Sequence, residues 1–200
     1  MNIIHKNIRL KQYDYSQPGA YFVTICTWKR KNLFGEIVNG AMQLNQWGEH
    51  AKKDWEITGC LRKEYIENDI FIIMPNHLHG IIVITKQITK PGMTAKLNAP
   101  IEQFGKPRKG SLSSIIQIYK TEVTKAIRYE GYGEYESVWQ PGYYEHIIRD
   151  DQEFNLIEEY IRYNPSLWDE DNENLFYKPK DRLSELDKIL KNTQPYRKTP

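Results

Sequence analysis

Cysteine is scarce in this chain, and long apolar runs are missing. The 200 residues include two cysteines, Cys26 and Cys60, which are too few for a disulfide framework or a cysteine-based zinc cluster. No stretch approaches the run of about eighteen apolar residues that a membrane-spanning helix needs. Residues 1–20 lack the apolar core of a secretion signal. We therefore expect a cytoplasmic protein that does not enter a membrane.

A large excess of one charge is also missing, because the formal net charge is +2. No overall basic field therefore argues for a nucleic-acid partner. The charges are nevertheless unevenly distributed. Residues 1–31 and 86–110 each carry six lysines and arginines against one acid, whereas 151–173 carries eight acids against Arg162. This separation predicts a polarised molecule that could bind phosphate on one side.

The chain has the length and composition of one ordinary domain, with 40% apolar and 27% charged residues. Runs rich in β-branched residues predict strands, and apolar residues at helical spacing predict helices. In chain order these are a strand at 20–28, a helix at 45–59, a strand pair at 65–85, a helix at 111–127 and a helix at 150–163. The order predicts an α+β fold, an antiparallel sheet with helices packed on one face.

Two segments do not fit a regular element. Residues 87–110 hold five lysines and arginines, three prolines and three glycines, and a loop of that length is either disordered or functional. Residues 169–174 are polar and predict a surface turn. We therefore divide the chain into a domain of residues 1–168, which contains the long basic loop 87–110, and a C-terminal extension of residues 169–200.

The segment Met74-Pro75-Asn76-His77-Leu78-His79 is the most informative feature, because apolar runs lead into and out of it. Residues two apart in a strand point to the same face, so His77 and His79 project side by side. Two parallel imidazoles form half of a metal site. The alternative is a histidine pair that only makes hydrogen bonds in the core.

Tyr160 and Asn164 supply what the histidines lack. They are four residues apart on the predicted final helix, so they share one face and could bring a nucleophile and a third metal ligand together. The alternative is a core tyrosine and an ordinary asparagine at a helix end. Tyr163 is the rival nucleophile, but it points about 100° away from Asn164.

Four blocks of the sequence together resemble the REP-associated tyrosine transposases of the HUH single-tyrosine superfamily, over about residues 18–168. The blocks are Gly19-Ala20-Tyr21-Phe22-Val23-Thr24, Met74-Pro75-Asn76-His77-Leu78-His79, Trp139-Gln140-Pro141 with Glu145-His146-Ile147-Ile148-Arg149, and Tyr160-Ile161-Arg162-Tyr163-Asn164-Pro165. The resemblance implies a ferredoxin-like sheet whose central strands carry the histidine pair. It also implies a single-strand DNA endonuclease that joins itself to DNA through tyrosine. The long basic loop departs from compact members of the family.

Attack of a tyrosine on a phosphodiester needs assistance, because a tyrosine hydroxyl has a pKa near 10 and is scarcely ionised at neutral pH. A divalent ion held by His77, His79 and Asn164 could polarise a phosphodiester and leave positions open for substrate. The ligand types allow Mg²⁺, Mn²⁺ or Zn²⁺, and the resemblance favours Mg²⁺ or Mn²⁺. The expected product is a 5′-phosphotyrosine and a free 3′-hydroxyl that can later rejoin the strand.

Further residues are expected around this centre. Glu145 and His146 could orient Tyr160, and His146 could replace Asn164 as the third ligand. Single-stranded or hairpin DNA from repetitive palindromic elements is the expected partner, which would associate the protein with the nucleoid, as a monomer or a dimer. The residues expected to contact DNA are Gly19, Lys29, Arg30, Lys31, Lys106, Arg108, Lys109 and Tyr143.

Three other functions compete with this interpretation. Another HUH nuclease, a replication initiator or a relaxase, shares the metal and tyrosine logic. A hydrolase that activates a metal-bound water would need more histidine or carboxylate ligands. A DNA-binding regulator with reduced catalysis would not need the intact Tyr160. A covalent protein–DNA adduct distinguishes the tyrosine enzymes from the other two.

Overall fold

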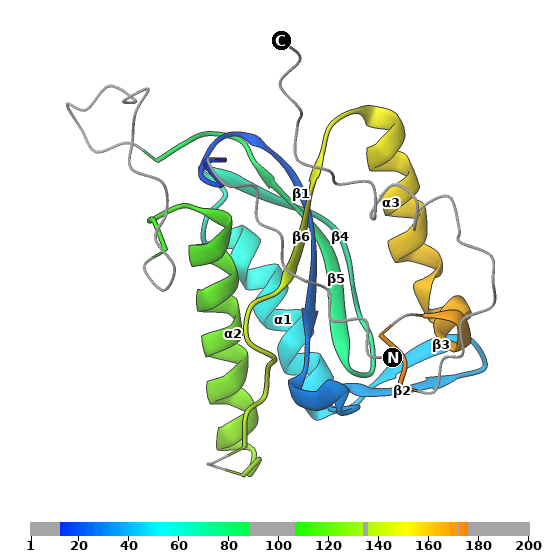
Figure 1. The fold of residues 1–200 in the computed structure, drawn as a ribbon. Coiled ribbons are helices and arrows are strands. Elements are labelled where there is room, and N and C mark those ends of the chain that lie inside the picture. The colour runs from blue at the N-terminus through cyan, green and yellow to red at the C-terminus, as the bar shows by residue number, and fades with distance from the viewer. Residues whose placement is uncertain (1–12, 89–106, 134–135, 172, 176–200) are drawn as a thin grey trace.

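The computed structural model describes residues 13–88, 107–133, 136–171 and 173–175. Its centre is an antiparallel sheet of four strands in the order β4-β5-β1-β6 (Figure 1). The strands are β1 (Gly19–Cys26), β4 (Ile66–Ile73), β5 (His77–Ile84) and β6 (Tyr144–Ile148). A separate hairpin, β2 (Gly35–Val38) and β3 (Ala41–Leu44), turns at Asn39 and Gly40, both with positive φ.

Within the described residues, three α-helices accompany the sheet, together with two short 3₁₀ helices. The α-helices are α1 (Gln46–Cys60), α2 (Leu112–Tyr129) and α3 (Asp151–Tyr163), and the 3₁₀ helices are η1 (Trp28–Arg30) and η2 (Asn164–Glu170). Asn45, Ser111 and Asp150 begin the three α-helices, and each side chain accepts a hydrogen bond from the backbone N–H three residues later. The predicted cap at Ser111 is confirmed, and of the two aspartates proposed for the last helix, Asp150 is the cap.

The order β1-α1-β4-β5-α2-β6 is that of a ferredoxin-like fold, so the predicted α+β antiparallel sheet is confirmed. Helices α1 and α2 pack on one face, where Trp55 and Tyr119 lie in the main core. Helix α3 follows the ferredoxin-like core and covers the opposite face (Figure 1). There Ile157 and Ile161 form a smaller apolar cluster with strand residues.

The pleat of the strands decides which side chains face α3. On β1, Phe22 belongs to the cluster under α3, whereas its neighbours Tyr21 and Val23 belong to the core under α1 and α2. On β5, Ile81 faces α3, and His77 and His79 share its face because residues two apart do so. The histidine pair therefore projects into the layer between the sheet and α3.

The C-terminal side of α3 differs from its prediction. Residues 169–174 were expected to form a surface turn, but Asp171, Glu173 and Asn174 are buried, with 6%, 7% and 7% of their surface exposed. The chain returns over the end of β1 and β5, so these polar side chains are covered by hydrogen-bonded partners. Most of the basic loop 87–110 and of the extension 169–200 lies outside the described residues.

Candidate functional site

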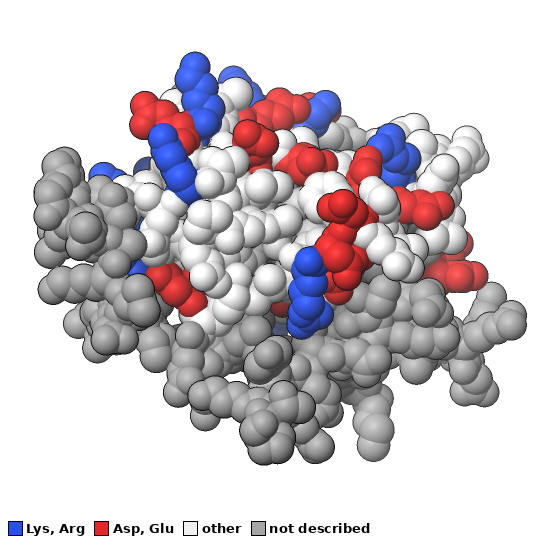
Figure 2. Space-filling view, turned by 90° about the horizontal axis from the view of Figure 1, so that it is seen from above, with Lys and Arg blue, Asp and Glu red and all other residues white. Residues whose placement is uncertain are grey.

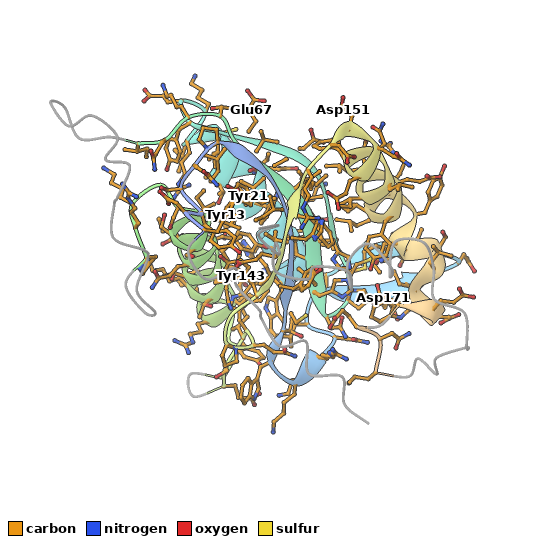
Figure 3. The ribbon with its side chains drawn as sticks, turned by 45° about the horizontal axis from the view of Figure 1, so that its top comes forward. Tyr13, Tyr21, Glu67, Tyr143, Asp151 and Asp171 are labelled. Carbon is orange, nitrogen blue, oxygen red and sulfur yellow. The ribbon has the colours of Figure 1, made fainter. Side chains whose placement is uncertain are left out.

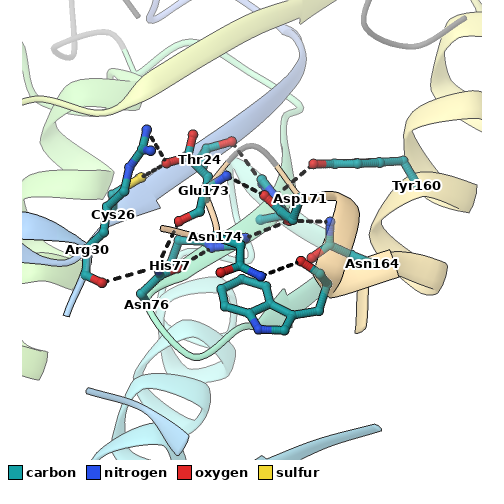
Figure 4. Close-up of polar contacts among 12 residues, drawn as sticks. Thr24, Cys26, Arg30, Asn76, His77, Tyr160, Asn164, Asp171, Glu173 and Asn174 are labelled. Carbon is teal, nitrogen blue, oxygen red and sulfur yellow. Dashed lines mark hydrogen bonds and ion pairs between the residues drawn. The ribbon is translucent and has the colours of Figure 1, made fainter. Parts of the chain in front are cut away.

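The two histidines lie against each other at the start of β5, with ring centroids 4.3 Å apart, and both are buried. Their Nδ1 atoms each meet a neighbouring oxygen. His77 Nδ1 is 2.8 Å from Asn76 Oδ1, and His79 Nδ1 is 2.9 Å from Thr24 Oγ1 on β1. These outer contacts leave the two Nε2 atoms on the side of Asp171, in the returning C-terminal segment. Figure 4 shows His77 and Asp171 in this arrangement.

Both imidazoles are neutral at ordinary pH. Burial, and next the positive charge of Arg30, lower the pKa of His77 to about 3. Burial, and next the neighbouring His77, lower the pKa of His79 well below its ordinary value. A neutral imidazole offers one nitrogen lone pair, which is the form that binds a metal ion.

Asp171 completes the cluster from the segment that follows η2. Its Oδ2 lies 3.7 Å from His77 Nε2 and 4.0 Å from His79 Nε2. Among the described residues, His77, His79 and Asp171 are the one group of histidine, cysteine and acidic side chains with ligand atoms close enough to share an ion, all within 4.8 Å of one another. The sequence interpretation missed Asp171, because Pro165 interrupts the helical spacing that would have linked it to Tyr160 and Asn164.

Asn164, the predicted third ligand, borders the same space. Its Nδ2 donates to Asp171 Oδ2 over 2.9 Å, while its buried Oδ1 has no hydrogen-bond partner among the described residues. His77 Nε2 is likewise buried and without a partner there. Unsatisfied buried acceptors are costly, and a cation would satisfy both. Two imidazole nitrogens, a carboxylate and an amide oxygen suit Mg²⁺, Mn²⁺ or Zn²⁺.

Tyr160 reaches this cluster from α3. Its hydroxyl lies 3.2 Å from His79 Nε2, and its ring packs edge-on against Phe22. Tyr163, the rival nucleophile, is 53% exposed. The structure thus brings Tyr160, the histidine pair and Asn164 together, and it adds Asp171.

Glu145 and His146, the residues proposed to support Tyr160, separate on β6. His146 Nε2 is 2.8 Å from Glu153 Oε1 on α3, so His146 contacts the beginning of the helix that carries Tyr160. It does not join the histidine cluster, where the third acidic or imidazole group is Asp171. Glu145 pairs with Val23 of β1, and the pleat therefore directs it to the α1 and α2 side.

The proposed DNA contacts fall at two ends of β1. At the histidine end, Cys26 pairs with His77, and η1 follows with Lys29 and Arg30 at φ 53°. Arg30 Nη2 lies 2.9 Å from Glu173 Oε2. Lys31 forms an ion pair with Glu136.

At the other end of β1, Gly19 pairs with Ile84. Arg108 Nη1 lies there, 3.0 Å from Asp14 Oδ2, and Lys109 is exposed. Lys106 lies outside the described residues. Tyr143 lies on the α2 side of the sheet, away from Asp171 (Figure 3), with its hydroxyl 3.3 Å from Ser113 Oγ.

The surface charge is mixed on the side of the molecule that lies at the top of Figure 1. Figure 2 shows basic and acidic side chains interspersed around an uncharged centre on that face. The predicted separation of charge is therefore not visible on that face.

No helix of the described residues is long and apolar enough to cross a membrane.

Comparison with known proteins gives one close relative. No family model matches the chain. An uncharacterized protein of Haemophilus influenzae strain Rd is 42% identical over 171 residues, which cover 83% of this chain and 91% of the relative. The chain belongs to that protein's family. Because that relative is uncharacterized, membership of its family does not assign an activity to this chain.

Two solved structures were found by comparison of the fold. A REP-associated tyrosine transposase bound to a REP hairpin superposes with a TM-score of 0.52 and 19% identity, covering 78% of this chain and 72% of that one. A proposed transposase from Deinococcus radiodurans R1 reaches a TM-score of 0.41 and 12% identity, over 77% of this chain and 95% of that one. At these identities the first similarity shows the fold alone.

Proposed function

We propose that this protein is a metal-dependent tyrosine transposase that nicks and rejoins single-stranded DNA at hairpins of repetitive palindromic elements. The observation that carries the proposal is the Tyr160 hydroxyl, 3.2 Å from His79 within a buried cluster of nitrogen and oxygen donors. A nucleophile beside a candidate metal site is the arrangement that covalent phosphoryl transfer needs. The shared fold of a transposase bound to a REP hairpin supports the substrate class.

His77, His79, Asp171 and Asn164 would hold a divalent cation, Mg²⁺ or Mn²⁺. When bound, such an ion withdraws charge from a phosphodiester oxygen and makes the phosphorus more electrophilic. The Tyr160 hydroxyl contacts His79 Nε2, and a cation would bind the same atom. A cation held at this atom would take the place of that contact, and the Tyr160 hydroxyl would then be able to face the substrate. Phe22 packs against the rings of His79 and Tyr160 and keeps Tyr160 within reach of the cluster.

The reaction exchanges one phosphate ester for another. The Tyr160 oxygen forms a bond to phosphorus as the bond from phosphorus to the 3′-oxygen breaks. The hydroxyl proton ends on that 3′-oxygen, so the products are a 5′-phosphotyrosine and a strand with a free 3′-hydroxyl. Attack by another 3′-hydroxyl reverses the step and rejoins DNA without a nucleotide cofactor.

A hydrolase is the second candidate, and Asp171 favours it. Two histidines and one carboxylate form a ligand set that leaves open positions for water. Such an enzyme would cut DNA through metal-bound water and would leave no protein on the strand. Tyr160 would then be dispensable for cleavage.

The two functions can be separated with one labelled oligonucleotide. The oligonucleotide should carry a palindromic hairpin with single-stranded flanks, taken from the repeats beside the gene. After incubation with Mn²⁺, a tyrosine transposase yields a labelled band that migrates with the protein on a denaturing gel, and chelation of the metal removes it. Free cleavage products without any protein-linked band would favour the hydrolase. Shifted complexes without cleavage would favour a binding protein.

A further inference from the structure

Asn76 lies directly before β5 and is 1% exposed. Its Nδ2 donates to two backbone carbonyls, that of Arg30 over 3.2 Å and that of Glu173 over 2.9 Å. Its Oδ1 lies 2.8 Å from His77 Nδ1. One buried amide thus joins η1, the segment that carries Asp171 and a candidate metal ligand (Figure 4).

The two carbonyls fix the direction of this amide. A carbonyl oxygen only accepts hydrogen bonds, so the NH₂ group must face the pair and Oδ1 must face His77. A flipped amide would set Oδ1 against both carbonyl oxygens. Oδ1 in turn only accepts, so the His77 proton must sit on Nδ1. The neutral ring carries one proton, and Nε2 is left with a bare lone pair that points toward Asp171.

His79 is not constrained in this way. Its Nδ1 meets the Thr24 hydroxyl and its Nε2 meets the Tyr160 hydroxyl. A hydroxyl can donate or accept, so either tautomer of His79 satisfies both contacts. The site therefore has one ring with a fixed lone pair and one ring whose lone pair can change sides.

We infer that Asn76 is a positioning residue that holds His77 in the Nδ1–H tautomer and keeps its Nε2 available to a metal ion. The claim that Nε2 serves a metal ion rests on the proposed function, whereas the assignment of the His77 tautomer does not. Because the same amide binds the Glu173 carbonyl, it also anchors the segment whose Asp171 faces that Nε2. Partners of this kind typically change metal affinity by about 10-fold to 100-fold when they are removed.

The tautomer can be measured in the metal-free protein. Long-range proton–nitrogen NMR correlations of the ¹⁵N-labelled histidine rings distinguish Nδ1–H from Nε2–H. We expect His77 as Nδ1–H across the neutral range. A predominant Nε2–H form of His77 would overturn the inference, whatever the protein does with DNA.

Metal affinity gives the second test. Calorimetric titration with Mn²⁺ should show binding to Asn76→Ala weakened by about 10-fold to 100-fold relative to the unchanged protein. Asn68→Ala is the matched control, because Asn68 Nδ2 also donates to a backbone carbonyl, that of Trp55, on the face of the sheet opposite to the histidines. The control should bind Mn²⁺ within about twofold of the unchanged protein.

The possible outcomes separate the inference from the proposed function. Equal affinity of the Asn76→Ala and Asn68→Ala proteins would contradict a role of Asn76 in the site. If the unchanged protein binds no divalent ion, the proposed metal function fails, and the ring measurement still decides the tautomer. If Asn76→Ala does not fold, the same ring measurement on the unchanged protein is decisive.

Discussion

The histidine pair is where a single side chain has the largest expected effect. His77→Ala or His79→Ala should abolish cleavage, because each removes a candidate ligand, whereas DNA affinity comes mainly from phosphate and base contacts. We expect the cleavage rate to fall by at least about 100-fold, since metal assistance contributes several kcal/mol. Cleavage gels and binding shifts on the same hairpin measure both quantities. Cleavage by either variant at nearly the rate of the unchanged protein would contradict the assignment of His77 and His79 as metal ligands.

His146 links pH to stability. Burial lowers its pKa below the ordinary value, although the contact with Glu153 opposes this shift. The unfolded chain therefore binds a proton more readily than the folded one, and stability is lost as the pH falls below about 6.5. His146→Gln keeps a donor for Glu153 but does not titrate. Its denaturation midpoint should fall less than that of the unchanged protein between pH 7 and pH 5, and equal losses would contradict a buried neutral His146.

Single residues also show where the sequence was insufficient. The alternation of a strand predicted that His77 and His79 would share a face, and the spacing of a helix predicted that Tyr160 and Asn164 would. Asp171 has neither signal, since it follows Pro165 and sits in a polar stretch that resembles an ordinary turn. Its burial depends on the contacts of the neighbouring Glu173 with distant parts of the chain, namely Asn76 and Arg30.

At the level of elements, α3 is held to the sheet at both ends. Glu153 accepts from the Arg149 backbone N–H and contacts His146, and Tyr160 meets His79 two turns later. Between them the contacts are apolar, and such contacts are not directional. The polar contacts at the two ends therefore fix the position of Tyr160 along the sheet.

Glu153→Ala tests this tether. It should lower the free energy of unfolding by about 1–3 kcal/mol, because the buried His146 ring and the partly buried Arg149 backbone N–H lose their acceptor. It should also slow adduct formation more than it weakens DNA binding. Glu158→Ala, on the same helix, removes an exposed ion pair with Arg162 and should cost about 0.5 kcal/mol or less. Equal effects of the two variants on adduct formation would argue against the tether.

The order of elements was predictable because strands and helices leave local periodicities in the sequence. The caps at Ser111 and Asp150 were predictable for the same reason, since a side-chain acceptor before an apolar stripe begins a helix. The face covered by α3 was not, because the amphipathic pattern of a helix does not say which side of a sheet it covers. The placement of α3 over the histidines is a property of the tertiary structure.

On the scale of the whole molecule, the two groups of cations are separated by the length of β1. Eight residues of extended strand span roughly 25 Å. A hairpin that reaches both groups would place its stem near Arg108 and Lys109 and its cleaved strand near η1. Binding and cleavage should therefore respond to different variants.

Neutralising Lys106, Arg108 and Lys109 to glutamine tests the distant group. Loss of three phosphate contacts should reduce the slope of log affinity against log salt by about two to three. Saturating DNA should restore the cleavage rate, since the histidine cluster is unchanged. Lys125→Gln, which removes an ion pair with Glu122 on α2, is the control and should leave the slope unchanged. An unaltered slope in the triple variant would place these residues away from DNA.

The most direct measurement identifies the tyrosine that carries the nucleotide. The adduct formed with single-stranded DNA is digested with protease and nuclease, and mass spectrometry locates the modified peptide. We expect the nucleotide on Tyr160, no adduct from Tyr160→Phe although it still binds DNA, and an adduct from Tyr163→Phe. A nucleotide on Tyr163, Tyr143 or Tyr144, or cleavage by Tyr160→Phe at the unchanged rate, would contradict the proposed role of Tyr160.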